Sequence, residues 1–177
     1  MVAAHSGDGV AGFAAGFAHP WTGVDHLLAM LAVGVVATIR NTRPWLVPLI
    51  FVCGMALGAV LGHATGASPL AEWGIAASLL VLGAAVALYR RLPGLAGPAL
   101  VVAAAMAHGH AHGAEAGAAV DRAGYGAGML LATAVLHALG VALGALGRAS
   151  LPVATGLRIA GAGTAVVGTL AIAGLIG

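Results

Sequence analysis

Charged residues are scarce in this sequence, and lysine is missing altogether. Only 7% of the 177 residues are charged and 61% are hydrophobic, whereas roughly 25% of a soluble domain is charged. The seven basic residues are dispersed arginines and the formal net charge is only +2, which excludes a nucleic-acid-binding surface. Without lysine there is no Gly-x-x-x-x-Gly-Lys nucleotide loop. The composition predicts an integral membrane protein with one domain, 1–177.

The single cysteine, Cys53, excludes an internal disulfide. A His-Glu-x-x-His motif is absent, and so are the regularly spaced intramembrane carboxylates of a proton relay. Glycine, by contrast, is abundant, with 29 residues. Small residues let membrane helices approach closely, so we interpret the run Gly54, Gly58 and Gly62 as a packing face. The expected fold is an all-α, tightly packed helical bundle.

Six apolar segments are predicted to cross the membrane as helices: 22–39, 45–63, 71–89, 97–112, 125–146 and 154–176. Residues 1–21 precede them. Within that segment, Gly9 to Ala18 is apolar but too short to span, because a spanning helix needs about 20 residues. We expect it to form a short surface or re-entrant helix. The segment 97–112 differs from the other five because three histidines lie in its last turns.

Arginine placement predicts the orientation. The first, third and fifth connections contain Arg40, Arg43, Arg90, Arg91 and Arg148, whereas the second contains none and the fourth only one. Short loops rich in arginine stay cytoplasmic, so both termini are expected on the periplasmic side of a bacterial inner membrane. Residues 1–8 lack the basic region and apolar core of a signal peptide, so if the native protein is exported with one, that signal is already missing here.

Two polar clusters adjoin the apolar segments, and both fall on the predicted outer side. They consist of His19, Asp25 and His26 before and within the first span, and of His108, His110, His112 and Glu115 at the end of the fourth. Polar groups in a membrane are costly and mark substrate or ion paths. Imidazole with carboxylate suits Ni, Co, Zn or Fe better than Mg or Ca. The clusters therefore predict one divalent-metal site, although helix capping and hydrogen bonds between spans are the alternative for each single histidine.

The other histidines are candidates of a different kind. His137 lies roughly 18 Å along the fifth span, at 1.5 Å per residue, and is predicted to be a deeper metal station. His63 ends the second span and is either a ligand or an interfacial polar residue. His110 faces away from its two neighbouring histidines if the helix continues, so it is a ligand or faces solvent. His5, on the terminus, recruits metal if processing brings a free amine near it.

The two motifs resemble the signatures of the HupE/UreJ family of small nickel permeases. The matching elements are His19-Pro20, Gly23 and Asp25-His26 for the first signature, and His108-Gly109, Ala111-His112-Gly113 and Glu115 for the second. The resemblance covers the whole chain in length and span count. It implies secondary transport of Ni²⁺, with Co²⁺ in some members, in support of hydrogenase or urease. It also implies a native precursor with a cleaved signal peptide, in agreement with the expected periplasmic N-terminus. It assigns the metal to the histidines and carboxylates of both motifs.

Two other functions use the same residues. An intramembrane hydrolase would hold Zn²⁺ with these histidines and use Asp25 or Glu115 as the general base. A metal sensor would bind the ion without moving it. Under the transport hypothesis the protein is not an enzyme and has no prosthetic group. Its partners are then the divalent ion, as substrate, and the lipid bilayer, while a homo-oligomer stays open.

Overall fold

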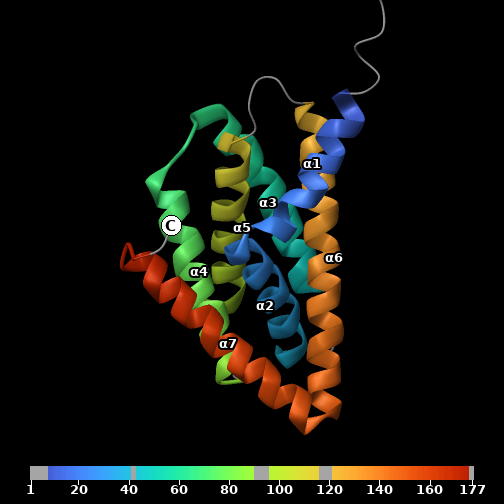
Figure 1. Ribbon diagram of the computed structural model, residues 1–177, viewed down its shortest axis with the longest axis vertical. Coiled ribbons are helices and arrows are strands. Elements are labelled where there is room, and N and C mark those ends of the chain that lie inside the picture. The colour runs from blue at the N-terminus through green and yellow to red at the C-terminus, as the bar shows by residue number, and fades with distance from the viewer. Residues whose placement is uncertain (1–7, 41–42, 90–95, 116–120, 176–177) are drawn as a thin grey trace, which may run out of the picture.

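A computed structural model describes residues 8–40, 43–89, 96–115 and 121–175, and every element in these ranges is an α-helix (Figure 1). The helices are α1 (Asp8–Thr22), α2 (Val24–Arg40), α3 (Leu46–Thr65), α4 (Pro69–Ala87), α5 (Ala96–Glu115), α6 (Arg122–Ala149) and α7 (Leu151–Ile172). The six predicted segments correspond to α2 through α7, with ends displaced by a few residues. The prediction of an all-α protein is confirmed.

Among the described residues, α3, α4, α6 and α7 are long and apolar enough to cross a membrane, as befits a multi-pass membrane protein. A fifth candidate is the pair α1 and α2, which is bent by 81°. With 17 residues, α2 alone is about 26 Å long, shorter than the ~30 Å hydrocarbon layer. The histidine-bearing α5 is not among these candidates. The count of six spans and the side of the termini stay predictions.

The longest helix, α6, packs against both helices of the bent pair, α1 and α2. Its 28 residues extend for about 42 Å, and α1 and α2 lie end to end beside it (Figure 1). A Cβ at Gly16 of α1 would collide with the Tyr125 backbone, and one at Gly34 of α2 would collide with the His137 carbonyl. The predicted short apolar helix is present as α1, and it extends further than expected, to Thr22.

Close packing of α3 on α5 confirms the predicted glycine face. Cβ atoms at Gly58 and Gly62 would meet the backbone of α5, and Cβ atoms at Gly109 and Gly113 would meet the backbone of α3. The backbones of α3 and α5 therefore contact each other directly, as is typical of glycine-rich membrane helices. Since α5 continues to Glu115 without a break, its histidines occupy defined faces.

The buried core lies among α2, α3, α4, α5 and α6, and α4 also packs along α7. Large apolar side chains remain on the outside, among them Leu57, Val60 and Ile159. Exposed apolar surface of this kind marks contact with lipid or another apolar partner. Three histidines, His26, His108 and His112, are instead buried inside the bundle, where they form the candidate site.

Candidate metal centre

The first motif lies at the junction of α1 and α2. His19 is in the last turn of α1, where Thr22 Oγ1 donates a hydrogen bond to the His19 carbonyl at 2.8 Å. Asp25 and His26 are in the first turn of α2, after the bend. A Cβ at Gly23 would lie 3.0 Å from Asp25 Oδ1 and 3.3 Å from His26 Nδ1, so glycine leaves these side chains their room.

The second motif reaches the first from α5. The His26 ring centroid lies 4.2 Å from that of His112 and 4.9 Å from that of His108. The His19 ring is 4.8 Å from the His112 ring. Glu115 Oε2 lies 3.7 Å from His112 Nδ1 and 3.9 Å from His19 Nε2. The prediction that the two motifs converge is therefore fulfilled in the geometry.

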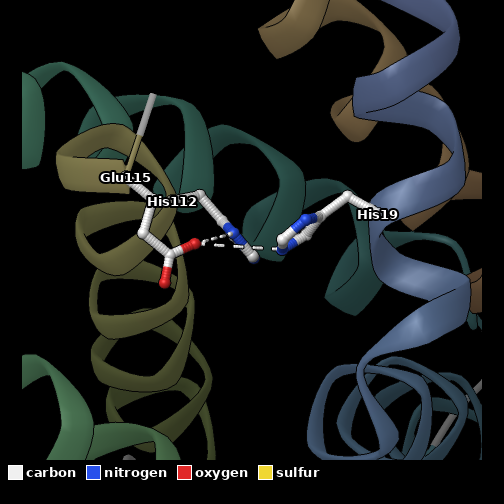
Figure 2. Close-up of side chains that lie close together, drawn as sticks. All are labelled: His19, His112 and Glu115. Atoms are coloured by element: carbon white, nitrogen blue, oxygen red, sulfur yellow. Dashed lines mark ion pairs between the residues drawn. The ribbon is translucent and has the colours of Figure 1, made fainter. Parts of the chain in front are cut away.

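Figure 2 shows the outermost group, His19 from α1 facing His112 and Glu115 from α5. One ligand atom of each residue lies within 4.8 Å of the others. Ligands bonded to one metal ion at about 2.0–2.1 Å, the usual Zn–N length, lie at most about 4 Å apart. A small side-chain rotation would thus bring the three onto one ion.

Hydrogen bonds fix which ring nitrogens are free. His108 Nδ1 lies 2.8 Å from the Ala104 carbonyl, which only accepts, so Nδ1 carries the proton. His26 Nδ1 lies 3.2 Å from Asp25 Oδ2 and donates to it. Both Nε2 atoms are therefore bare lone pairs, and both are buried without a hydrogen-bond partner. A buried ring nitrogen without a hydrogen-bond partner costs free energy. A partner that orients the ring through its other nitrogen, as Asp25 and the Ala104 carbonyl do here, is typical of metal-binding histidines.

The carboxylates supply negative charge at the exposed side. The side chain of Glu115 is 60% exposed. The neighbouring His112 imidazole, as the main cause, lowers the pKa of the Glu115 carboxyl below its usual value, although partial burial raises it. The distance of 3.7 Å between Glu115 Oε2 and His112 Nδ1 is too long for a good hydrogen bond, and the two groups form an ion pair only when His112 is protonated. Glu115 is therefore ionised at neutral pH and available to a cation.

His63 and His110 make their side-chain contacts outside the cluster. Arg122 NH1 lies 3.3 Å from His63 Nε2 and donates to it, which occupies that lone pair. The Thr65 hydroxyl donates to the Leu61 carbonyl at 2.9 Å, so His110 Nε2, 2.9 Å from Thr65 Oγ1, is the donor in their contact. His110 thus faces α3, on the side of α5 away from the cluster.

Of the two remaining histidines, only His137 is described by the structure, and it lies apart from the cluster. His137 is fully buried on α6, and neither of its ring nitrogens has a partner. Its ring centroid is 5.0 Å from that of Phe51. His5 lies outside the described residues. The roles predicted for these two and for His63 and His110 stay predictions.

Two neighbours of the cluster are not evident from the sequence. The Tyr125 ring lies 6.0 Å from the His19 ring, and Phe51 lies 5.8 Å from the His108 ring. An apolar cavity of about 530 Å³ between α3, α5 and α6 also reaches His112. No spacing signal could identify these features, because they arise from packing between helices that are distant in sequence.

The motifs that meet in this cluster belong to a known kind of protein. A family model described as HupE / UreJ protein matches residues 1–171. The chain belongs to the HupE/UreJ family. A HupE/UreJ relative, "Protein HupE" of Rhizobium leguminosarum bv. viciae, is 41% identical over 174 residues, which cover 97% of this chain and 90% of that protein. No solved structure matches the chain.

Membership of the HupE/UreJ family confirms the resemblance inferred from the two motifs. The match covers nearly the whole chain, so both motifs lie within it. Residues of the two HupE/UreJ motifs are also those that the structure brings together around the bare nitrogens of His26 and His108.

Proposed function

We propose that the protein is a secondary transporter that takes up Ni²⁺, and also Co²⁺, through the histidine–carboxylate cluster. The observation that carries this proposal is the set of buried ring nitrogens without partners, on His26, His108 and His112, in a helical membrane protein. Imidazole nitrogen with carboxylate oxygen suits a divalent transition metal. Family membership supports the same conclusion, because the HupE/UreJ resemblance implies nickel transport.

The cluster has an exposed end and a buried end, as uptake requires. The Glu115 side chain is 60% exposed, that of His19 is 35% exposed and that of His112 only 1%. His26 and His108 follow, both buried. An incoming ion would meet Glu115 and His19 first and exchange part of its water shell for them. It would then pass to the inner imidazoles, with Asp25 offsetting its charge.

The membrane potential is sufficient to drive this movement. One charge crossing 100 mV gains about 2.3 kcal/mol, so a divalent ion gains about 4.6 kcal/mol. Since about 1.4 kcal/mol is a factor of ten, this supports roughly a thousandfold accumulation. No coupled proton is needed for such a gradient.

The proposal includes a topology. Six spans, with both termini on the periplasmic side of the inner membrane, place the cluster at the periplasmic entrance, and His137 forms the deeper station. The imported metal would serve hydrogenase or urease. In this topology, α5 crosses the membrane with its histidine-bearing turns shielded by α2 and α3, which accounts for three histidines on one membrane helix.

Uptake of ⁶³Ni²⁺ into proteoliposomes tests the proposal. We expect an inside-negative potential to accelerate uptake, and excess Co²⁺ to compete. Uptake that is absent, or that equals the rate of protein-free vesicles, would contradict it. Tight Ni²⁺ binding without flux would then support a metal sensor, and retained Zn²⁺ with hydrolysis of a peptide substrate would support the intramembrane hydrolase.

A further inference from the structure

Five of the protein's aromatic and imidazole rings that lie inward from His19 form a continuous series. Starting from His19, each ring centroid is 4.2–5.8 Å from the next, in the order His112, His26, His108, Phe51 and His137. Every ring of the series except one offers nitrogen to a metal ion. The exception, Phe51, separates the outer cluster from the inner histidine.

The inner end of the series lies deep in the bundle. The His137 carbonyl abuts Gly34 of α2, which is eight residues beyond His26 and hence about 12 Å further along that helix. Both ring nitrogens of His137 are buried and have no hydrogen-bond partner. An unpartnered imidazole at this depth is costly unless it has a polar ligand to receive.

The seam between α3 and α6 is closed around Phe51. One turn along α3 from Phe51, the Thr133 hydroxyl of α6 donates to Met55 Sδ at 3.6 Å. Phe51, Met55, Thr133 and His137 are all 0% exposed. The seam is thus sealed at two successive levels, and the Phe51 ring lies between the His108 ring of the outer cluster and the His137 ring.

We propose that Phe51 is a hydrophobic gate between the outer cluster and a second metal station at His137, a proposal that rests on the transport function above. The phenyl ring has no ligand atom, so an ion cannot stay at its level and must pass from His108 to His137 when the ring turns aside. Apolar constrictions of this kind control permeation by excluding water.

The two stations differ in charge. The outer cluster has the carboxylates of Asp25 and Glu115, whereas the rings and side chains described around His137 are neutral. A divalent cation is therefore held more weakly at His137, which suits a station that must release its ion inward. With the gate closed, an ion at His137 is occluded from the outside, so its exchange with external chelator is slow.

A chelator chase on the purified full-length protein tests the gate. The protein is loaded with ⁶³Ni²⁺ in micelles, and release into excess EDTA is followed over time. We expect two phases, a fast one from the outer cluster and a slow one from His137. His137→Ala should remove the slow phase and keep the fast one, and Phe51→Ala should accelerate the slow phase at least tenfold. Phe51→Leu, which retains most of the bulk, should accelerate it about threefold.

Leu79→Ala is the matched control, because Leu79 is also a large buried side chain but lies on α4, against α7. Its release phases should equal those of the wild type. Equal acceleration by Leu79→Ala and Phe51→Ala would reveal general loosening and overturn the gate. So would a single release phase in a wild-type protein that transports Ni²⁺, or a slow phase that survives His137→Ala. Two phases without uptake into proteoliposomes would instead retain the inner station and refute the transport proposal.

Discussion

Two nitrogen atoms, Nε2 of His26 and Nε2 of His108, determine what the site can do. In both rings the proton lies on Nδ1. The His26 Nδ1–H donates to Asp25, and the His108 Nδ1–H donates to the Ala104 carbonyl. Each therefore presents a lone pair in a buried environment. A backbone carbonyl and a carboxylate are the usual partners that orient a ligand histidine.

Replacing Asp25 with asparagine should weaken metal binding while leaving the ligand histidines in place. Asp25→Asn removes the charge that fixes the His26 proton on Nδ1, and losses of such orienting partners typically cost about 10–100-fold in affinity. Titration calorimetry with Ni²⁺ measures the change. Asp121→Asn is the matched control, because Asp121 precedes α6 and makes no side-chain capping hydrogen bond. Equal affinity in Asp25→Asn and wild type would remove Asp25 from the site.

Local spacing is sufficient to predict that His108, His112 and Glu115 lie together, because they share one face of a single helix. It also predicts that His110 turns away from His108 and His112, since residues two apart do not share a helix face. It cannot identify Phe51, which is one apolar residue within an apolar helix. The importance of Phe51 arises only when α3 packs between α5 and α6.

Among the helices, α5 presents its histidines on two different faces. His108 and His112 face α2, whereas His110 faces α3 and donates to Thr65. The division depends on an unbroken helix, because a break at Gly109 or Gly113 would rotate one histidine relative to the others. The sequence alone leaves this point open, since glycine both breaks helices and permits close packing.

Alanine substitutions of His26 and of His110 should distinguish metal-ligand histidines from structural ones. His26→Ala should abolish Ni²⁺ uptake, because it removes the ring closest to both His108 and His112. His110→Ala should retain uptake within about twofold, since its ring contacts Thr65 outside the cluster. Proteoliposome uptake, normalised to the amount of inserted protein, provides the comparison. Loss of uptake in His110→Ala, with normal insertion, would show that the second motif binds metal differently.

The α3–α5 contact should tolerate no added methyl group at Gly113. A Cβ there would collide with the Ala59 backbone, and overpacking of this kind costs about 1–3 kcal/mol. Gly113→Ala should therefore lower the thermal unfolding midpoint in detergent. Gly163→Ala, where a Cβ meets nothing within 4 Å, should leave the midpoint unchanged or raise it, because alanine favours a helix by about 1 kcal/mol over glycine. Equal midpoints for the two variants would contradict the packing described.

At the scale of the whole molecule, many large apolar side chains lie on the exterior, in contrast to a soluble protein, while the interior holds an apolar core with the histidine cluster inside it. Composition predicts this arrangement and the approximate helix boundaries. It does not predict that α1 and α2 form a pair bent by 81°, because glycine and proline near residue 20 signal a break without giving its angle. That bend is what directs His19 and His26 to the same place.

External pH should control uptake through the imidazoles. Ligand histidines must be neutral to bind metal, and free imidazole titrates near pH 6.5. Burial lowers the pKa of half-buried His19 below the usual imidazole value, so its protonation rises toward the acid end of the range from pH 7.5 to 5.5. The bound proton then competes with the ion, and uptake at fixed potential should fall. Glu115, whose pKa is lowered, stays ionised across this range and does not contribute to the fall. Uptake that stays constant from pH 7.5 to 5.5 would argue against capture by histidine.

X-ray absorption at the nickel K-edge, on the protein loaded with one equivalent of Ni²⁺, tests most directly that the histidine cluster holds the ion. We expect two or more imidazole nitrogens in the coordination shell together with carboxylate oxygen, and we expect the imidazole signal to decrease in His112→Ala. A shell of oxygen atoms alone, or one that is unchanged in His112→Ala, would contradict the site built from His19, His112 and Glu115.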